Sequence, residues 1–170
     1  MAYRNYIKLT TPLYLILMPP FTKYVNNLRQ DIFTLKFSIK NSLELTHALQ
    51  HLNIQNSYKL VSFDGKHIFP SIPVSDLKII LEKRINSNII DPSRNSHIRQ
   101  LLDLCLNQNY FIFNNKYYEQ QEGLPMDSPI SPVLSKIYIS HLEQSMLNPI
   151  NPHFKHIVFW RRYVDDIFVI

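Results

Sequence analysis

Glycine and cysteine are scarce in this chain of 170 residues, and it has no long hydrophobic run. The single cysteine, Cys105, excludes an internal disulfide and is typical of a reducing compartment. The longest apolar run, residues 13–18, is much too short to span a bilayer, and no signal-peptide pattern opens the sequence. We therefore expect a soluble, intracellular protein with no membrane partner. The two glycines, Gly65 and Gly123, are far fewer than usual and mark positions to inspect.

Positive charge is concentrated in the first third of the chain. Residues 1–60 hold seven Lys/Arg and two Asp/Glu, a net charge of +5, whereas residues 61–170 hold eleven of each, a net charge of zero. A basic segment joined to a carboxylate-rich segment suggests a polyanion held near a metal site. An ordinary solvated basic surface explains the same charge equally well. Charge alone does not choose between the two interpretations.

Apolar periodicity predicts two helices in the first half of the chain. The first covers residues 41–52, with Asn41 or Ser42 as its N-cap. The second covers residues 74–85, with Ser75 as its N-cap. Its expected apolar stripe runs through Leu77, Ile80 and Leu81.

Two more helices are expected over residues 96–106 and 131–147. Pro132 suits the first turn of the later one. The expected apolar face of that helix consists of residues at four-residue steps: Leu134, Tyr138, Leu142 and Met146.

Strand patterns occupy the segments between these helices. Residues 58–64 alternate and end on the carboxylate Asp64. Residues 110–119 are typical of a hairpin that turns at Asn114-Asn115, and its aromatic side chains fit either stacking on bases or packing across the strands. The closing strands flank Asp165–Asp166, read as a two-residue hairpin connection. Helices together with hairpins favour an α+β fold with a mixed or antiparallel sheet.

Two adjacent aspartates, Asp165 and Asp166, interrupt the apolar ending WRRYVDDIFVI. Adjacent like charges repel, so we expect a cation between them and a third carboxylate. Asp64 supplies this third carboxylate if the strand that it ends lies beside the hairpin. Carboxylate oxygens without Cys or His neighbours suit two Mg²⁺ or Mn²⁺ ions. In a strand the two aspartates would face opposite sides, which favours Asp165 as the direct ligand. A polar hairpin turn explains the isolated pair equally well.

Three blocks of the sequence resemble, in order and spacing, those of reverse transcriptases. VSFDGKHIFPSIP resembles their first aspartate block, and RYVDDIF resembles their Tyr-x-Asp-Asp block. GLPMDSPISPVLSKIYISHLE resembles the block between them, with its Ser-Pro-x-Ser-Pro helix start. Within the family, the pattern is most similar to the Penelope-like retroelement group. The resemblance covers residues 11–170.

The resemblance implies an RNA-directed DNA polymerase. It implies a polymerase palm over residues 61–170, with an inserted fingers segment near 91–122, a partial fingers segment over 1–60, and no thumb. The implied partners are an RNA template, a DNA primer and a deoxynucleoside triphosphate, and the implied cofactors are two Mg²⁺ or Mn²⁺ ions. A nuclear location would follow for action on chromosomal DNA.

The resemblance also implies a role for each matching residue. Asp64 and Asp165 would be the metal-binding catalytic pair, with Asp166 beside them and the Gly65 carbonyl as a further metal ligand. Phe69 would pack under the sugar and exclude a 2′-hydroxyl, although core packing explains it too. The remaining implied nucleotide contacts are Gly123, Pro125, Met126, Asp127, Ser128 and Tyr163.

One residue departs from the family pattern. Asp127 stands where the family has glycine in Met-Gly-Ser-Pro, and it adds negative charge beside the expected phosphates. Aspartate tolerates left-handed backbone better than most residues, so the fold can survive. A decayed remnant that binds nucleic acid without polymerase activity therefore stays open. An unrelated α+β interaction module with a chance Asp-Asp turn also stays open.

Overall fold

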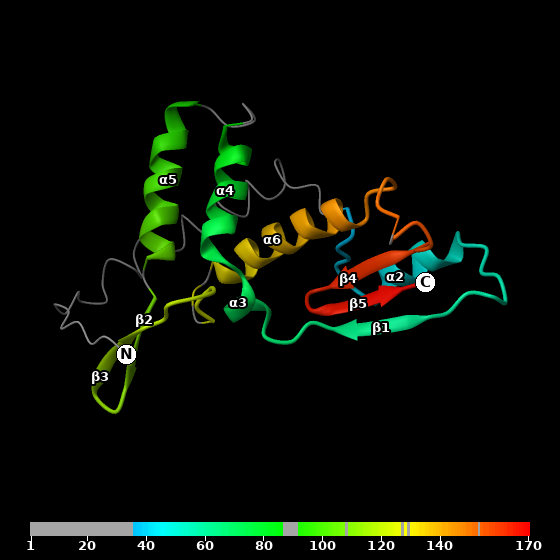
Figure 1. Cartoon of the computed structure of the whole chain (residues 1–170), viewed down its shortest axis with the longest axis horizontal. Coiled ribbons are helices and arrows are strands. Elements are labelled where there is room, and N and C mark those ends of the chain that lie inside the picture. The colour runs from blue at the N-terminus through cyan, green and yellow to red at the C-terminus, as the bar shows by residue number, and fades with distance from the viewer. Residues whose placement is uncertain (1–35, 87–91, 108, 127, 129, 153) are drawn as a thin grey trace. The chain divides into compact units, whose positions relative to one another are not determined.

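The computed structural model describes residues 36–86, 92–107, 109–126, 128, 130–152 and 154–170. Helices and antiparallel sheets occur together in this part of the chain (Figure 1), which confirms the α+β fold class. Asp127 lies outside the described residues, as does most of the expected fingers segment over residues 1–60.

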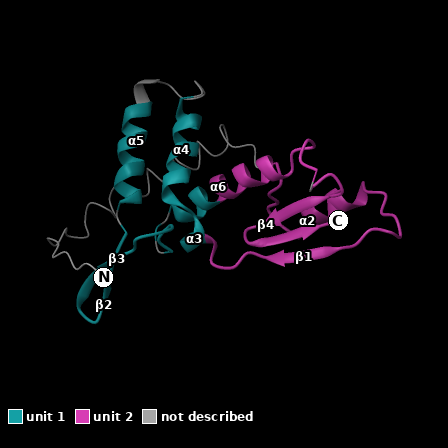
Figure 2. Ribbon diagram, in the orientation of Figure 1, with its two compact units in different colours: residues 1–34, 69–135 teal, residues 35–68, 136–170 magenta. Residues whose placement is uncertain are grey.

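The chain divides into two compact units (Figure 2). One unit contains Phe69–Ser135, and the other contains Leu35–Ile68 together with Lys136–Ile170. Residues on both sides of position 60 therefore belong to the same unit. The division into palm and fingers stays a prediction.

Two helices, α4 (Val74–Ile85) and α5 (Pro92–Leu106), provide much of the core of the first unit. Ion pairs join them: Nζ of Lys78 lies 3.0 Å from Oδ1 of Asp103, and Nε of Arg99 lies 2.9 Å from Oε2 of Glu82. The expected apolar stripe of α4 is confirmed. The buried apolar side chains of the two helices are Leu77, Ile80, Leu81, Ile85, Ile98, Leu102, Cys105 and Leu106.

The range expected for α4 is confirmed, but its expected N-cap and the expected start of α5 are wrong. Pro73, not Ser75, is the N-cap of α4, and its carbonyl accepts the first helical hydrogen bond from the Leu77 N–H at 3.1 Å. Proline fits there because the start of a helix leaves its N–H groups without helical partners. The helix α5 starts at Pro92 instead of Ser96, since proline also suits the first turn.

A hairpin follows α5, as the sequence predicts. Strands β2 (Tyr110–Phe113) and β3 (Lys116–Glu119) pair antiparallel. Asn114 and Asn115 form the turn with φ of 49° and 56°, the left-handed region that asparagine tolerates. The rings of Phe111 and Tyr118 stack across the strands with centroids 5.5 Å apart, which accounts for these two aromatics by cross-strand packing.

A three-stranded antiparallel sheet forms the centre of the second unit. It contains β1 (Val61–Asp64), β4 (Trp160–Tyr163) and β5 (Asp166–Val169) in the order β1-β5-β4. The pairing of β1 with β5 joins segments about one hundred residues apart. On the outer edge of β4, residues 37–39 form a parallel bridge to Arg162. The same unit contains α2 (Ser42–Gln50). Of the two N-caps that the sequence allowed, Asn41 is the one observed, and its side chain accepts a hydrogen bond from the Glu44 N–H.

Helix α6 (Ser131–Met146) forms as predicted, but its expected apolar face is wrong. Of the four residues expected there, only Leu134 is buried, and Leu142 is 39% exposed. Three-residue steps describe the buried face: Ser131, Leu134, Ile137, Ser140 and Glu143. Glu143 faces inward because it bonds a buried cation on β4. None of the helices in the described ranges is long and apolar enough to cross a bilayer.

Candidate functional site

Acidic side chains gather at one end of the sheet in the second unit. Asp64, the last residue of β1, is the Cα partner of Asp166, the first residue of β5. On its other side, Asp166 is paired with Tyr163 of β4. Directly opposite residues in antiparallel strands project from the same face. Asp64, Asp166 and Tyr163 therefore form a row across the three strands, and all three are exposed.

The turn beside this row differs by one residue from the expected connection. Strand β4 ends at Tyr163 and β5 begins at Asp166, so the two connecting residues are Val164 and Asp165. The expected Asp165–Asp166 connection is wrong. The sequence favoured Asp165 as the direct ligand because successive residues of a strand face opposite sides. Asp165 lies in the turn and not in a strand, so that reason does not apply to it. Val164 has φ of 55°, which is rare for a β-branched residue.

Gly65 links the end of β1 to the same turn. Its N–H donates a hydrogen bond of 3.0 Å to the carbonyl of Asp165. A Cβ at position 65 would lie 3.2 Å from that carbonyl oxygen and 2.8 Å from Cδ1 of Ile68. Glycine thus permits the close approach of the two segments. The four residues of the expected metal site, Asp64, Gly65, Asp165 and Asp166, are adjacent in the structure.

The acidic row projects from the sheet face opposite to α6. Side chains alternate along β4, so Trp160 and Arg162 point away from the side of Tyr163. Both bond Glu143 of α6: the indole N–H donates to its Oε1 at 3.1 Å, and Nε of Arg162 donates to the same oxygen at 2.8 Å. Helix α6 therefore packs against one face of the sheet, and the carboxylates lie on the other.

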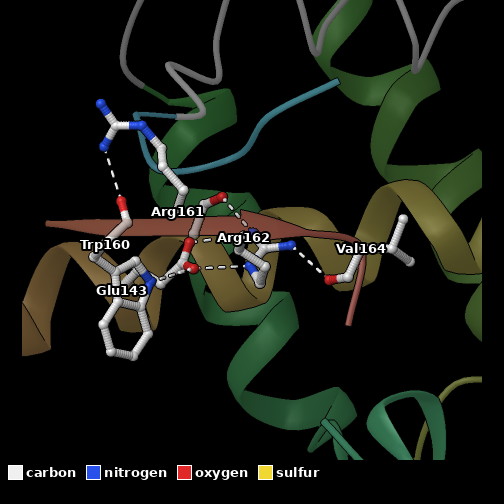
Figure 3. Close-up of polar contacts among 6 residues, drawn as sticks. Glu143, Trp160, Arg161, Arg162 and Val164 are labelled. Carbon is white, nitrogen blue, oxygen red and sulfur yellow. Dashed lines mark hydrogen bonds and ion pairs between the residues drawn. The ribbon is translucent and has the colours of Figure 1, made fainter. Parts of the chain in front are cut away.

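A buried charge network lies between α6 and β4 (Figure 3). Arg162 and Glu143 form a two-pronged ion pair, because Nη2 of Arg162 also donates to Oε2 of Glu143 at 3.1 Å. Each side chain is 1% exposed. Further guanidinium bonds reach Ser140 Oγ at 3.4 Å and the carbonyl of Val164 at 3.0 Å. This network was not predicted from the sequence. The pattern that could have revealed it is the spacing of Glu143, which lies on three-residue steps from Leu134 and so falls on the same helix face.

In the first unit, the loop between β3 and α6 contains the expected nucleotide contacts. Gly123 has φ of 77°, and a Cβ there would overlap the backbone of Pro70 in α3 (Ile68–Ser71). The Leu124 N–H donates to the carbonyl of Phe69 at 2.8 Å. This part of the loop is therefore fixed beside α3, with Phe69 as a direct neighbour.

The rest of this loop offers both a fixed and an exposed part. The hydroxyl of Ser131 donates to the carbonyl of Pro125 at 2.5 Å, and Met126 is 64% exposed. The hydroxyl of Ser128 is buried and has no hydrogen-bond partner among the described residues. Phe69 is half-buried, which leaves both packing and a sugar contact open. The acidic row belongs to the other unit.

The donor chemistry of the acidic row fits divalent ions of the magnesium type. Within the described residues, no three Asp, Glu, His or Cys side chains form a ready-made metal centre. Mg²⁺ in phosphate-transfer sites keeps several waters and takes one or two carboxylates plus substrate phosphates. Exposed carboxylates at a sheet end suit that incomplete coordination. They do not suit a closed structural site.

Comparison with known proteins gives two partial similarities and no match to a family model. The chain is 31% identical over 78 residues to the telomerase reverse transcriptase of Euplotes aediculatus, covering 43% of this chain and 8% of that protein. It is 32% identical over 78 residues to the telomerase reverse transcriptase of Oxytricha trifallax, covering 43% and 7%. The chain spans less than a tenth of the length of these relatives. The similarities support a reverse-transcriptase-like segment in this chain.

Proposed function

We propose that this chain is the palm and part of the fingers of an RNA-directed DNA polymerase from a Penelope-like retroelement. The reaction is nucleotidyl transfer. The 3′-hydroxyl oxygen of a DNA primer attacks the α-phosphorus of a deoxynucleoside triphosphate paired with an RNA template, and pyrophosphate leaves as the new phosphodiester bond forms. Copying at chromosomal ends or breaks would require the protein to work in the nucleus.

The observation that most supports this proposal is the pairing of Asp64 with Asp166 beside Asp165. Three carboxylates from segments far apart in the sequence lie at one exposed sheet end. The partial similarity to two telomerase reverse transcriptases is independent support for a polymerase of this kind. It also makes an unrelated interaction module a poorer explanation of the Asp165–Asp166 pair.

The carboxylates have the role of holding divalent ions and positioning the reacting groups. Two bound ions would promote ionisation of the primer hydroxyl and neutralise charge on the leaving phosphate. Asp64 and Asp165 would hold them, Asp166 would complete the negative site, and the Gly65 carbonyl would add a ligand. Most of the rate increase in such transfers comes from positioning and charge stabilisation.

The loop in the first unit has the role of receiving the nucleotide. The ring of Phe69 would lie under the sugar and clash with a 2′-hydroxyl, which selects deoxynucleotides. Met126 is exposed and available to a ligand, whereas the Ser128 hydroxyl, which has no partner among the described residues, is buried and would need the loop to open before it could bond one. Gly123, Pro125 and Asp127 complete the proposed loop contacts, and Tyr163 would flank the carboxylates on the adjoining strand.

The test is primer extension on an RNA template by the full-length protein with Mg²⁺ or Mn²⁺. Asp64→Asn removes one charge at the proposed site and is expected to abolish extension. The matched control is Asp103→Asn, which removes an exposed carboxylate in the first unit and should leave extension near its original rate. An extension rate untouched by Asp64→Asn would refute the proposed function.

A second candidate function is a decayed remnant that folds and binds nucleic acid without polymerising. The observation in its favour is Asp127, which replaces the family's glycine with a negative side chain. Asp127→Gly in the full-length protein separates the two candidates. A large gain in extension would identify a decayed copy, and an unchanged active rate would show that Asp127 is compatible with polymerase activity.

A further inference from the structure

The Asp165 turn is held from two sides within the second unit. From β1, the Gly65 N–H donates to the carbonyl of Asp165 at 3.0 Å. From β4, Nη1 of Arg162 donates to the carbonyl of Val164 at 3.0 Å (Figure 3). The two carbonyls belong to the two residues of the turn. Their orientation therefore depends on one backbone donor and one side-chain donor.

The guanidinium that holds Val164 is itself fixed. Glu143 binds it through both carboxylate oxygens, at 2.8 and 3.1 Å, and Ser140 lies 3.4 Å from Nη2. The backbone of Arg162 is also paired, because its N–H donates to Phe37 at 2.8 Å and its carbonyl accepts from Ile39 at 2.9 Å. With 1% of the side chain exposed, Arg162 has no freedom to release the turn and point into solvent.

The residue that Arg162 holds is conformationally unfavourable. Val164 has φ of 55° and 46% exposure, so neither its own backbone preference nor burial of its side chain favours the observed turn. Strained residues of this kind persist only where surrounding contacts determine their conformation. The bond from Arg162 to the Val164 carbonyl is such a contact.

Stability alone does not account for a buried arginine and glutamate at this place. Replacing a buried ion pair with apolar residues of similar volume is often neutral or stabilising, because removing both charges from water is costly. An apolar pair would fill the space between α6 and β4, but it would offer no donor to the Val164 carbonyl. The donor is what distinguishes the charged pair from an apolar one.

We propose that Glu143 and Arg162 are positioning residues that fix the Val164–Asp165 turn and thereby hold the Asp165 and Asp166 carboxylates in place for divalent ions. This inference rests on the proposed function, since it assigns the carboxylates to metal binding. Neither residue touches the ions or the substrate. Both act through the backbone carbonyl of Val164.

The test replaces Glu143→Leu and Arg162→Met together in the full chain, which removes the donor while keeping an apolar filling. The control is the same double change in the first unit, Glu82→Leu with Arg99→Met, which removes another arginine–glutamate pair. Three quantities are measured for each protein: the unfolding midpoint in urea, the ¹⁵N relaxation of the Val164 and Asp165 amides, and Mn²⁺ affinity by calorimetry.

The expected result is a double variant that stays folded, with a mobile turn and Mn²⁺ binding weakened by about tenfold, as for other residues that orient metal ligands. The control pair should keep a rigid turn and unchanged affinity. Arg162→Lys serves if the double variant does not fold, because lysine keeps the charge pair but lacks the planar fork that bonds Glu143 and Val164 at once.

The outcomes separate this inference from the proposed function. A rigid turn with unchanged Mn²⁺ affinity in the folded variant would overturn the positioning role and leave the proposed function intact. Equal weakening in the control pair would overturn it as well, since the effect would then be general. No Mn²⁺ binding by the unsubstituted chain would overturn the proposed function and, with it, the inference.

Discussion

The chain's two glycines provide a matched pair of substitutions whose effects the structure predicts to differ. Gly123→Ala places a methyl group where φ is 77° and where the new Cβ overlaps the backbone of Pro70. Gly65→Ala places the same group where φ is not positive. There the nearest atom is the end of the flexible Ile68 side chain at 2.8 Å, followed by the Asp165 carbonyl oxygen at 3.2 Å.

The cost at position 123 has three parts. Left-handed backbone costs a non-glycine residue about 1–2 kcal/mol, and overpacking against fixed backbone costs about 1–3 kcal/mol. Reduced freedom of the unfolded chain returns about 0.4–1 kcal/mol. We therefore expect Gly123→Ala to lower the free energy of unfolding by about 2–4 kcal/mol. Gly65→Ala should cost about 1 kcal/mol or less, because Ile68 can move and the entropic gain offsets part of the contact.

Urea unfolding followed by circular dichroism gives the two free energies. Amide hydrogen exchange at Leu124 adds a local measurement, because its N–H is bonded to the carbonyl of Phe69. Protection at Leu124 should fall in Gly123→Ala and persist in Gly65→Ala. Equal costs for the two variants, or full protection of Leu124 in Gly123→Ala, would refute the assignment of Gly123 as the residue that allows the loop to approach α3.

Three further predictions concern the core, the thiol and the proposed sugar contact. Glu143→Leu alone leaves Arg162 buried without its partner and should lower the free energy of unfolding in urea by about 3–5 kcal/mol. Adding Arg162→Met should restore most of the lost stability. Equal stability of the single and double variants would contradict this. Burial raises the pKa of Cys105 from 9.0 to about 11, so its stabilisation is present below pH 9 and is lost as the pH rises toward 11, by at most about 1.4 kcal/mol per pH unit. Cys105→Ala should remove that pH dependence, and an identical slope in both proteins would count against it. Phe69→Ala in the full-length protein should lower the preference for deoxynucleotides over ribonucleotides, measured as a ratio of kcat/KM, by about tenfold, whereas an unchanged ratio would favour core packing.

Local patterns predicted most of the helices and the aromatic hairpin. Apolar spacing located α4, and the capping chemistry of Asn41 and Ser42 located the start of α2 to within one residue. The Asn114-Asn115 turn followed from the tolerance of asparagine for left-handed backbone. These features depend on residues close in sequence, so one sequence is enough to find them. The pairing of β1 with β5 depends on distant segments, and the order of the three sequence blocks was the signal for it.

Features decided by long-range contacts were not predictable in the same way. Aspartate is common in turns and valine is not, so the sequence favoured Asp165–Asp166 as the connection. In the structure the connection is Val164–Asp165 instead. The pairing of Tyr163 with Asp166 and the hydrogen bond from Arg162 to the Val164 carbonyl outweigh the local preference. The buried face of α6 differs for the same reason, since Glu143 is drawn inward by a cation 19 residues later.

The most direct test of the account is where Mn²⁺ binds on the ¹⁵N-labelled chain. Paramagnetic broadening at low Mn²⁺ should appear first at the amides of Asp64, Gly65, Asp165 and Asp166, and Asp64→Asn should abolish it there. Broadening that is spread over all exposed carboxylates, or centred on the α4–α5 pair of the first unit, would contradict the claim that β1 and the β4–β5 turn together form a divalent-ion site.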